Sequence, residues 1–289
     1  KEPFSRFLTQ FYKNNRQMGS SDRRMNSRFC YNFFRLGRAF VSLTPTEKLT
    51  IAEFLCEVES GVVEVFMPEW ADKLGLGIQE KVEVVESKYG KFLDKVFSFA
   101  DYLSPTIDKN AFILSHFVQP NLYIRIQKGM ENKVRKTLEK NSIPFEEISE
   151  QTLSLKNGTN LQQVKGLDGT YEVQDWSSQQ SLNDLVIPER SSWWDCCAAS
   201  GGKSLLLLDK EPNIKLLVSD VRLSILRNLD ERFEKANVKT YFRKKILDLS
   251  KPVSNIMGEE SFDGIILDAP CSGSGTWGRT SEMLWKFSK

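Results

Sequence analysis

The chain has 289 residues, enough for two or three domains of ordinary size and a sizeable buried core. Its 40 basic and 38 acidic side chains leave a formal net charge of +2, so total charge alone does not indicate a nucleic-acid partner. The five cysteines are an odd number, and the sequence shows neither a secretory n-region nor an apolar run long enough for a bilayer, which argues against a disulfide scaffold and favours a reducing cytoplasm.

Helical spacing dominates the first part of the chain. Apolar residues recur every three or four positions over residues 4–60, as at Phe33 and Phe40, and this spacing returns over residues 82–102. The aromatic residues of the second stripe repeat along one face, which is typical of a packed core rather than of a stacking platform. The pattern predicts an α-helical domain over residues 1–115.

Positive charge is concentrated near the N-terminus. Residues 1–40 hold nine Lys or Arg side chains and two acids, an excess of seven, so the remainder of the chain carries −5. A basic surface of this kind attracts phosphates at long range and makes binding depend on salt. Charge alone leaves an alternative open, because a solvated helical face has the same composition.

Two further regions follow the helical one. A small α+β module is predicted over residues 116–170, and a doubly wound parallel sheet over residues 171–289, where strand and helix patterns alternate as βαβ units. The expected strands span residues 121–126, 145–148, 152–155, 193–194, 215–219, 240–242 and 262–267, and the expected helices span 130–139, 205–208 and 223–235.

The run WWDCCAASGGKS, residues 193–204, contains the first strand-to-helix turn of the predicted sheet. In doubly wound sheets this turn carries glycines so that the backbone can approach a ligand. Gly201 and Gly202 would offer amides at a helix N-terminus, a place suited to a carboxylate or a phosphate, and Lys203 would add charge. A phosphate-binding P-loop is disfavoured, since that motif requires glycine where Cys197 stands.

Acidic residues follow the successive strands of this region. Asp220 stands eighteen residues beyond Gly202 at the end of the second strand, where an acid typically accepts hydrogen bonds from ribose hydroxyls. Asp248 follows the third strand and is placed to meet an adenine edge, and Asp268 follows the fourth. Each acid alone is compatible with a helix cap or a solvated turn. Together with the glycine turn, the three acids predict a nucleoside cofactor.

The run DAPCSGSG, residues 268–275, puts the thiol of Cys271 three positions beyond Asp268. Pro270 fixes the backbone before the cysteine, and the small residues behind it let another molecule come close. Such a loop suits a flat substrate such as a nucleobase. Cys271 is therefore a candidate nucleophile or leaving-group residue.

With these runs assembled, the chain resembles the RsmB/Sun family of RNA (cytosine-5)-methyltransferases, which use S-adenosyl-L-methionine. The family's motif at the glycine turn reads D-x-C-A-A-P-G-G-K-T, and it is matched here by Asp195, Cys197, Ala198, Ala199, Gly201, Gly202 and Lys203. Ser200 replaces the usual proline, an exchange that we expect to loosen the turn slightly without removing its amides. DAPCSGSG matches the family's fourth motif throughout, and residues 169–179 resemble the segment before its catalytic core.

The resemblance implies a Rossmann-like class I methyltransferase core over residues 171–289 and a pre-catalytic RNA-binding module over 116–170. More weakly, the Arg-rich stretch Asp22–Arg38 makes residues 1–115 similar to the NusB-like RNA-binding domain of some members. The implied cofactor is S-adenosyl-L-methionine and the implied partner is RNA, in particular ribosomal RNA. The residues assigned to the cofactor are Cys197, Ala198, Ala199, Ser200, Gly201, Gly202, Lys203, Asp220, Asp248 and Asp268.

Methylation of cytosine at C5 requires activation of the base, because C5 is a poor nucleophile. A thiolate adds to C6, the resulting enamine attacks the donor methyl through C5, and the C5 proton and the thiolate then leave. The base must also be unstacked to be reached. Cys271 and Asp268 are the candidate catalytic residues, with Asp268 hydrogen-bonding the base near N3.

In the family, a cysteine of a later motif attacks C6, and the cysteine that matches Cys271 assists product release. No cysteine follows Cys271 here. Three interpretations stay open: the natural protein continues beyond Lys289 and supplies that cysteine, Cys271 is itself the nucleophile, or the protein binds without catalysis. The first is favoured, because an open half-sheet would expose apolar edges and faces.

The same residues also bear on three other functions. An N-methyltransferase would call for an Asn-Pro-Pro-aromatic type of motif where DAPC stands. A non-catalytic RNA-binding or ribosome-assembly factor that keeps the cofactor fold, and a methyltransferase acting on transfer RNA, are the alternatives. We expect no metal site, because His116 is the one histidine and the cysteines lack zinc-type spacing, and we expect a cytoplasmic monomer without membrane contact.

Overall fold

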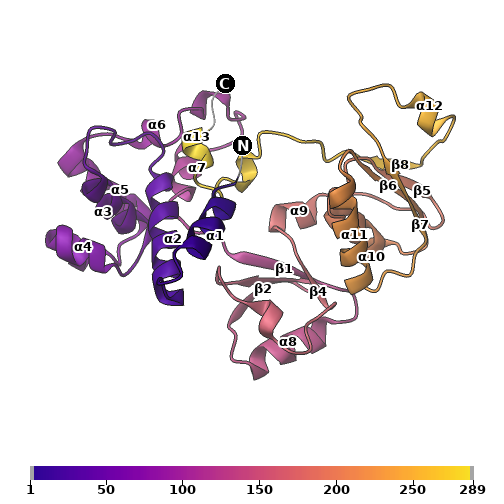
Figure 1. Cartoon of the computed structure of the whole chain (residues 1–289), viewed down its shortest axis with the longest axis horizontal. Helices are drawn as coiled ribbons and strands as arrows, with labels where there is room; N and C mark the ends of the chain where they lie inside the picture. Colours follow the sequence, from indigo (N-terminus) through magenta and orange to yellow (C-terminus); the bar gives the residue numbers. More distant parts are fainter. Residues whose placement is uncertain (1–2, 287–289) are drawn as a thin grey trace. The chain divides into compact units, whose positions relative to one another are not determined.

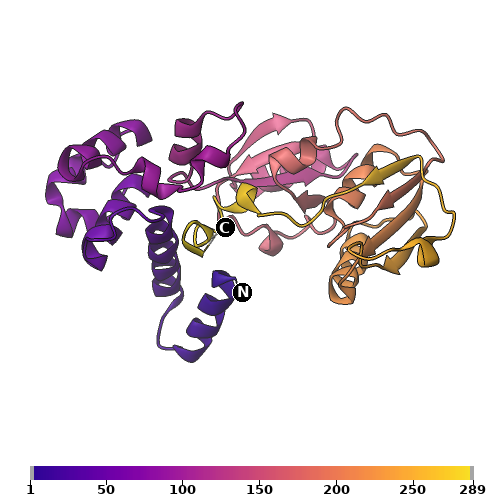
Figure 2. The ribbon, with the colours of Figure 1, turned by 90° about the horizontal axis from the view of Figure 1, so that it is seen from above.

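The computed structural model describes residues 3–286, and the chain divides into two compact units. The first contains Lys1–Pro120 together with Ser272–Lys289, and the second contains Asn121–Cys271. Figure 1 and Figure 2 show the ribbon of each unit in two views. No helix among residues 3–286 has the length and apolar character that crossing a bilayer requires.

The first unit is helical, as the apolar spacing predicted, and its short last helix lies beside α2 (Figure 1). Its α-helices are α1 (Phe4–Asn14), α2 (Ser20–Arg35), α3 (Pro45–Cys56), α4 (Gly61–Phe66), α5 (Ile78–Tyr89), α6 (Leu93–Val96), α7 (Lys109–Ser115) and α13 (Met283–Lys286). Short 3-10 turns span η1 (Pro68–Lys73), η2 (Ala100–Tyr102) and η4 (Ser274–Thr276).

Local sequence sets the boundaries of these helices. The hydroxyl of Thr44 accepts a hydrogen bond from the Glu47 amide (3.3 Å), and the Glu47 carboxylate accepts one from the Thr44 amide (3.0 Å). This capping box starts α3. The stripe predicted over residues 82–102 is not one helix, because Gly90 takes a φ of +78° and ends α5. The aromatic residues of that stripe nevertheless belong to the core of the unit, as predicted.

The segment that follows Cys271 packs into this helical core. Trp277 is 2% exposed and its ring lies 5.9 Å from that of Phe97. Leu284 is equally enclosed. The buried guanidinium of Arg35 donates to the carbonyl of Gly278 at 2.8 Å, so a side chain of α2 fixes the backbone of the segment.

The second unit begins with a four-stranded antiparallel sheet in the order β2-β3-β1-β4. Its strands are β1 (Leu122–Ile126), β2 (Phe145–Ser149), β3 (Thr152–Leu155) and β4 (Tyr171–Val173). Helix α8 (Glu131–Lys140) covers one face (Figure 1), where Val134 and Leu138 pack with buried strand residues. The turn η3 (Leu161–Gln163) and helix α9 (Trp176–Gln180) complete the region.

The rest of the second unit is a Rossmann-like sheet with the order β7-β6-β5-β8 and parallel pairing throughout. Its elements are β5 (Ser192–Asp195), α10 (Gly202–Lys210), β6 (Lys215–Asp220), α11 (Leu223–Lys235), β7 (Phe242–Ile246), α12 (Ser254–Met257) and β8 (Gly264–Ile266). The predicted doubly wound sheet is confirmed. The bounds of β7 differ most, since it begins two residues later than expected and extends to Ile246, and β8 is shorter than expected at both ends.

Side chains alternate between the two faces of the sheet along each strand, so the apolar residues form a cluster on each face. Trp193 faces the cluster formed by α10 and α11, whereas its neighbour Trp194 packs with the smaller cluster at α12. The last strand, β8, lies at the sheet edge with Ile265 and Leu267 exposed. The chain order reverses between β5 and β8, and ligands of doubly wound sheets bind at such a switch point, beyond the carboxyl ends of the strands.

Candidate cofactor and active site

The loop between β5 and α10 is held against its neighbours. The Ala199 amide donates to Oδ2 of Asp220 at the end of β6, over 3.1 Å. Both Ala199 and Gly201 adopt left-handed backbone angles, with φ of +47° and +82°. A Cβ on Gly201 would lie 2.6 Å from the ring of Phe233 in α11. Glycine is therefore required at position 201 for both conformation and space.

The two glycines of the turn have different roles. The Gly201 amide donates to the Ala198 carbonyl at 2.8 Å, so it closes the turn instead of facing a ligand as the sequence suggested. Gly202 is the first residue of α10, and the first amides of a helix have no acceptor within it. The amides that are free to donate to a ligand at this end of α10 therefore begin at Gly202.

Asp195 ends β5 beneath this loop and is 1% exposed. Its Oδ2 accepts a hydrogen bond from the Ser204 hydroxyl at 2.6 Å, while its Oδ1 has no partner among the described residues. Burial raises the pKa of Asp195 to about 6, although the Ser204 hydrogen bond works in the opposite direction. The unpartnered oxygen is a buried acceptor at the pocket described below.

Asp220 ends β6 in the position that the sequence predicted. Burial acts to raise its pKa, but hydrogen bonds from the Arg222 side chain and amide and from the Ala199 amide outweigh that effect, so the pKa is lowered. The residue is 6% exposed. The structure therefore holds an ionised acceptor at the carboxyl end of the second strand.

An ion pair joins the two sequence motifs. Nζ of Lys203, in the first turn of α10, lies 2.7 Å from Oδ2 of Asp268, which follows β8. The Lys203 side chain is 21% exposed and that of Asp268 is 56% exposed. Residues that stand 65 positions apart in the chain are thereby brought to one edge of the sheet.

Around this ion pair lies a pocket of about 250 Å³. Its lining from the two motifs comprises Asp195, Cys197, Ala198, Ala199, Ser200, Gly202, Lys203 and Asp268. Four predicted site residues do not line it, namely Gly201, Asp220, Asp248 and Cys271. Gly201 and Asp220 nevertheless shape the loop that forms one wall.

Asp248 and Cys271 are the predicted residues that the structure leaves outside this pocket and its wall. Asp248 accepts hydrogen bonds from the amide and the hydroxyl of Ser250, and those bonds lower its pKa. Cys271 carries an exposed thiol three positions beyond Asp268. Among residues 3–286, no three His, Cys, Asp or Glu side chains are grouped as they would be around a metal ion.

Other residues of the pocket were missed by the sequence reasoning. Gln174 and Asp175 line it from the segment before α9, and Ser178 lines it from α9 itself. The resemblance of residues 169–179 to the family was the signal that could have found them. Arg232 lines the pocket from α11 and carried no such signal, because it is one of several charged residues on an amphipathic helix.

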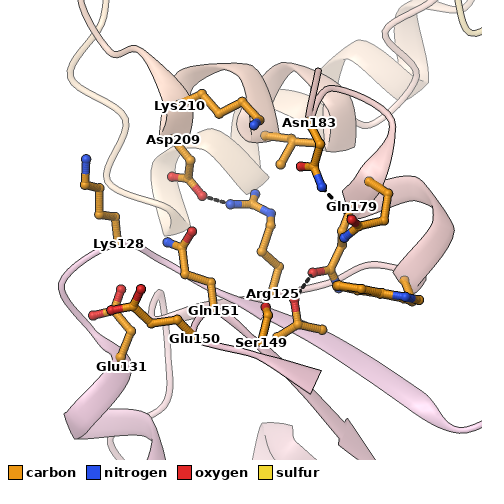
Figure 3. Close-up of a pocket in the computed structure, with 14 residues that line it drawn as sticks. Arg125, Lys128, Glu131, Ser149, Glu150, Gln151, Gln179, Asn183, Asp209 and Lys210 are labelled. Atoms are coloured by element: carbon orange, nitrogen blue, oxygen red, sulfur yellow. Dashed lines mark hydrogen bonds and ion pairs between the residues drawn. The ribbon is translucent and has the colours of Figure 1, made fainter. Parts of the chain in front are cut away.

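A different pocket lies at the opposite end of α10 (Figure 3). Figure 3 shows the buried Arg125 of β1 reaching toward the half-buried Asp209, with which it forms an ion pair. Burial lowers the pKa of Arg125 to about 10. Lys128 and Lys210 are among the other lining residues. This pocket contains no residue of either sequence motif.

Sequence comparison finds relatives for the second half of the chain. Residues 184–289 match the sequence model of a family described as "16S rRNA methyltransferase RsmB/F". Ribosomal RNA small subunit methyltransferase B of Shewanella oneidensis is 33% identical over 119 residues, and that of Shigella sonnei is 31% identical over 118 residues. Each alignment covers 41% of this chain and 27% of the relative, so the chain matches about a quarter of their length.

Solved structures share the fold. The structure titled "Crystal Structure of PH0851" covers 97% of this chain, and 73% of its own, with a TM-score of 0.66 at 18% identity. NSun6 from Pyrococcus horikoshii with SFG covers 72% of this chain and 73% of its own with a TM-score of 0.51 at 14% identity. At 18% and 14% sequence identity, these structures show that the fold is similar and nothing about function.

Proposed function

We propose that the protein methylates C5 of a cytosine in RNA with S-adenosyl-L-methionine, because residues 184–289 match the RsmB/F methyltransferase model and resemble proteins of the RsmB/Sun type. Ribosomal RNA is the proposed substrate, because the related proteins are named as ribosomal RNA methyltransferases. The observation that carries the proposal is the ion pair between Lys203 and Asp268. It joins the glycine turn to the DAPC loop at the switch point of the sheet, where a doubly wound fold binds its ligand.

The pocket fits the proposed cofactor by its donor and acceptor groups. The amides at the start of α10 suit the carboxylate of the methionine part. The unpartnered Oδ1 of Asp195 is a buried acceptor for its ammonium group. Outside the pocket lining, Asp220, ionised at the end of β6, is the proposed acceptor for ribose hydroxyls, and Asp248 remains the proposed contact for adenine. When bound, the cofactor would supply an electrophilic methyl group.

Asp268 and Cys271 are the proposed catalytic residues. The Lys203 ammonium holds the Asp268 carboxylate in the pocket wall, where that carboxylate can hydrogen-bond a base near N3. Pro270 and the small residues after Cys271 leave its exposed thiol accessible to a flat ring. We assign Cys271 the assisting role in product release, with direct attack on C6 as the alternative.

The helical unit is the proposed RNA-binding part, but not all of its basic stretch is available. Arg35 is buried, and the guanidinium of Arg28 lies 2.9 Å from the enclosed Glu53 carboxylate. Arg16 and Arg24 are exposed. The proposed phosphate contacts therefore come from the exposed arginines, and Arg35 has a structural role instead.

The test is methyl transfer by the natural protein from tritiated S-adenosylmethionine to unmodified ribosomal RNA, followed by digestion to nucleosides. We expect 5-methylcytidine as the labelled product, and Asp268→Ala should reduce its formation at least 100-fold, on the order of one general acid-base or electrostatic contribution. A labelled product other than 5-methylcytidine would overturn the proposal. Binding of RNA and cofactor without transfer would instead support a non-catalytic assembly factor.

Replacement of Cys271 by alanine separates its two proposed roles. If it assists release, the variant should accumulate a covalent protein–RNA adduct that survives denaturing electrophoresis. If Cys271 is the nucleophile, the variant should form no adduct and transfer no methyl group. Cys30→Ala, which changes a thiol of the helical unit, is the matched control and should behave like the natural protein.

A further inference from the structure

We propose that Arg232 and Ser200 are positioning residues for the cofactor loop, an assignment that rests on the function proposed above. Arg232 lies in α11, and Ser200 lies in the loop between β5 and α10. Glu172 of β4 holds the arginine from its other side. We call the three residues the Glu172–Arg232–Ser200 bridge.

Two hydrogen bonds build the bridge. Nε of Arg232 donates to Oε2 of Glu172 at 2.6 Å, and Nη1 donates to Oγ of Ser200 at 3.1 Å. The side chains of Arg232 and Glu172 are 25% and 10% exposed, so the pair is largely shielded from water. A hydrogen bond that an ionised donor makes in such a place is stronger than an exposed one. The bridge thus connects the antiparallel sheet to α11 and to the loop.

The loop needs such a connection because its backbone is unusual on both sides of Ser200. Ala199 precedes it with φ of +47° and Gly201 follows it with φ of +82°. The family motif has proline at this position, and a proline ring restricts φ by itself. Serine has no ring, so the hydrogen bond from Arg232 takes over the restraint. The exchange does not simply loosen the turn, as the sequence suggested, because the hydroxyl gains a partner.

The guanidinium also lies close to where the cofactor would bind. Nη1 of Arg232 is 3.5 Å from the position of a Cβ on Gly202, the first residue of α10. Both Ser200 and Arg232 line the pocket that holds Lys203 and Asp268. A shift of the loop would therefore move the amides at the start of α10 relative to the ligand.

The experiment measures binding of S-adenosylhomocysteine by calorimetry, together with the melting temperature of each variant. Ser200→Ala and Arg232→Gln should each weaken binding by about 5- to 10-fold, the net worth of one ordinary intramolecular hydrogen bond. Ser200→Thr keeps the hydroxyl and should bind as the natural chain does. Arg227→Gln changes an exposed arginine of the same helix and is the matched control.

The double variant Ser200→Ala/Arg232→Gln distinguishes a shared role from two separate ones. If the two residues act through one bond, the double variant should bind no more weakly than the weaker single variant. A merely structural bridge would lower the melting temperature and leave the affinity within twofold. If Arg232→Gln proves unstable, Ser200→Ala decides, because it leaves no buried charge unpaired.

The binding experiment distinguishes failure of the positioning role from failure of the proposed methyltransferase function. A natural chain that binds S-adenosylhomocysteine while both single variants bind within twofold of it overturns the positioning role and leaves the proposed function standing. Fully additive losses in the double variant overturn it as well. A natural chain that does not bind S-adenosylhomocysteine overturns the proposed function, and the positioning role with it.

Discussion

His116 is a buried histidine in the core of the helical unit, 3% exposed. Its ring stacks on Phe97 with centroids 5.8 Å apart and meets Phe112 edge-on at 5.0 Å. Neither ring nitrogen has a hydrogen-bond partner among the described residues. Burial, followed by the nearby charge of Arg35, lowers the pKa of His116 to about 4. The residue is therefore neutral in the folded protein at physiological pH.

From the lowered pKa of His116 we predict that the free energy of unfolding falls at acidic pH. The pKa in the folded state, about 4, lies below the unfolded value of 6.5, so the unfolded chain binds the proton first. The full stability is present above pH 6.5 and is lost as the pH falls toward 4. At pH 5 the contribution amounts to about 2 kcal/mol, from the shift in pKa and about 1.4 kcal/mol per unit.

The substitution His116→Phe removes this titration and leaves no unpaired ring nitrogen. We expect the variant to lose less stability than the natural chain between pH 7.5 and pH 5, by about 2 kcal/mol in urea unfolding. His116→Gln keeps a buried polar group without the titration and is the control for the pH effect. An equal loss of stability in the natural chain and in both variants would contradict the assignment.

Some of the site residues could be predicted from the sequence and others could not. Motif spacing led to Lys203 and Asp268, which the structure joins by an ion pair. It did not find Arg232, because the hydrogen bond to Ser200 links residues 32 positions apart that no motif connects. Nor did it show that Arg35 is enclosed, since a basic residue on a helix has no sequence mark of burial.

At the scale of elements, the glycine turn is the most demanding part of the second unit. Gly201→Ala should destabilise this unit by about 2 to 5 kcal/mol, because it combines a left-handed backbone with a Cβ placed 2.6 Å from the Phe233 ring. Gly202→Ala, one residue later, meets no atom closer than 3.5 Å and starts a helix. It should change the free energy of unfolding by no more than about 1 kcal/mol.

The measurement is denaturant unfolding followed by circular dichroism, with the two neighbouring variants compared. A loss of about 1 kcal/mol or less for Gly201→Ala, no larger than that for Gly202→Ala, would show that the turn tolerates a side chain at position 201 and would contradict the prediction. Binding of the cofactor product is a poor readout here, since both positions adjoin the pocket.

Periodicity predicted most of the elements but not their ends. The α/β alternation from β5 to β8 gave the parallel sheet, because buried strands and amphipathic helices differ in their apolar spacing. Two elements differ from the prediction for reasons in their local sequence. Gly90 interrupts a continuous apolar stripe with a positive φ, and β7 has exposed charged residues, Arg243 and Lys244, that hide its strand character.

At the scale of the whole molecule, the DAPCSGSG run spans the boundary between the two units. The second unit ends at Cys271, and the residues from Ser272 belong to the helical unit. Trp277 and Leu284 enter its core from a turn and a four-residue helix. Segments this short have no readable period, so the sequence could not show to which core they belong. The boundary between the two compact units therefore falls inside the DAPCSGSG motif, not after it.

The most direct test of the account maps 5-methylcytosine in the RNA of cells that lack the natural gene. Nucleoside mass spectrometry and position mapping should show the loss of a 5-methylcytosine from ribosomal RNA. The natural gene should restore it, and a gene carrying Asp268→Ala should not. An unchanged 5-methylcytosine pattern, with loss of a methyl group from another atom or base, would contradict the central claim.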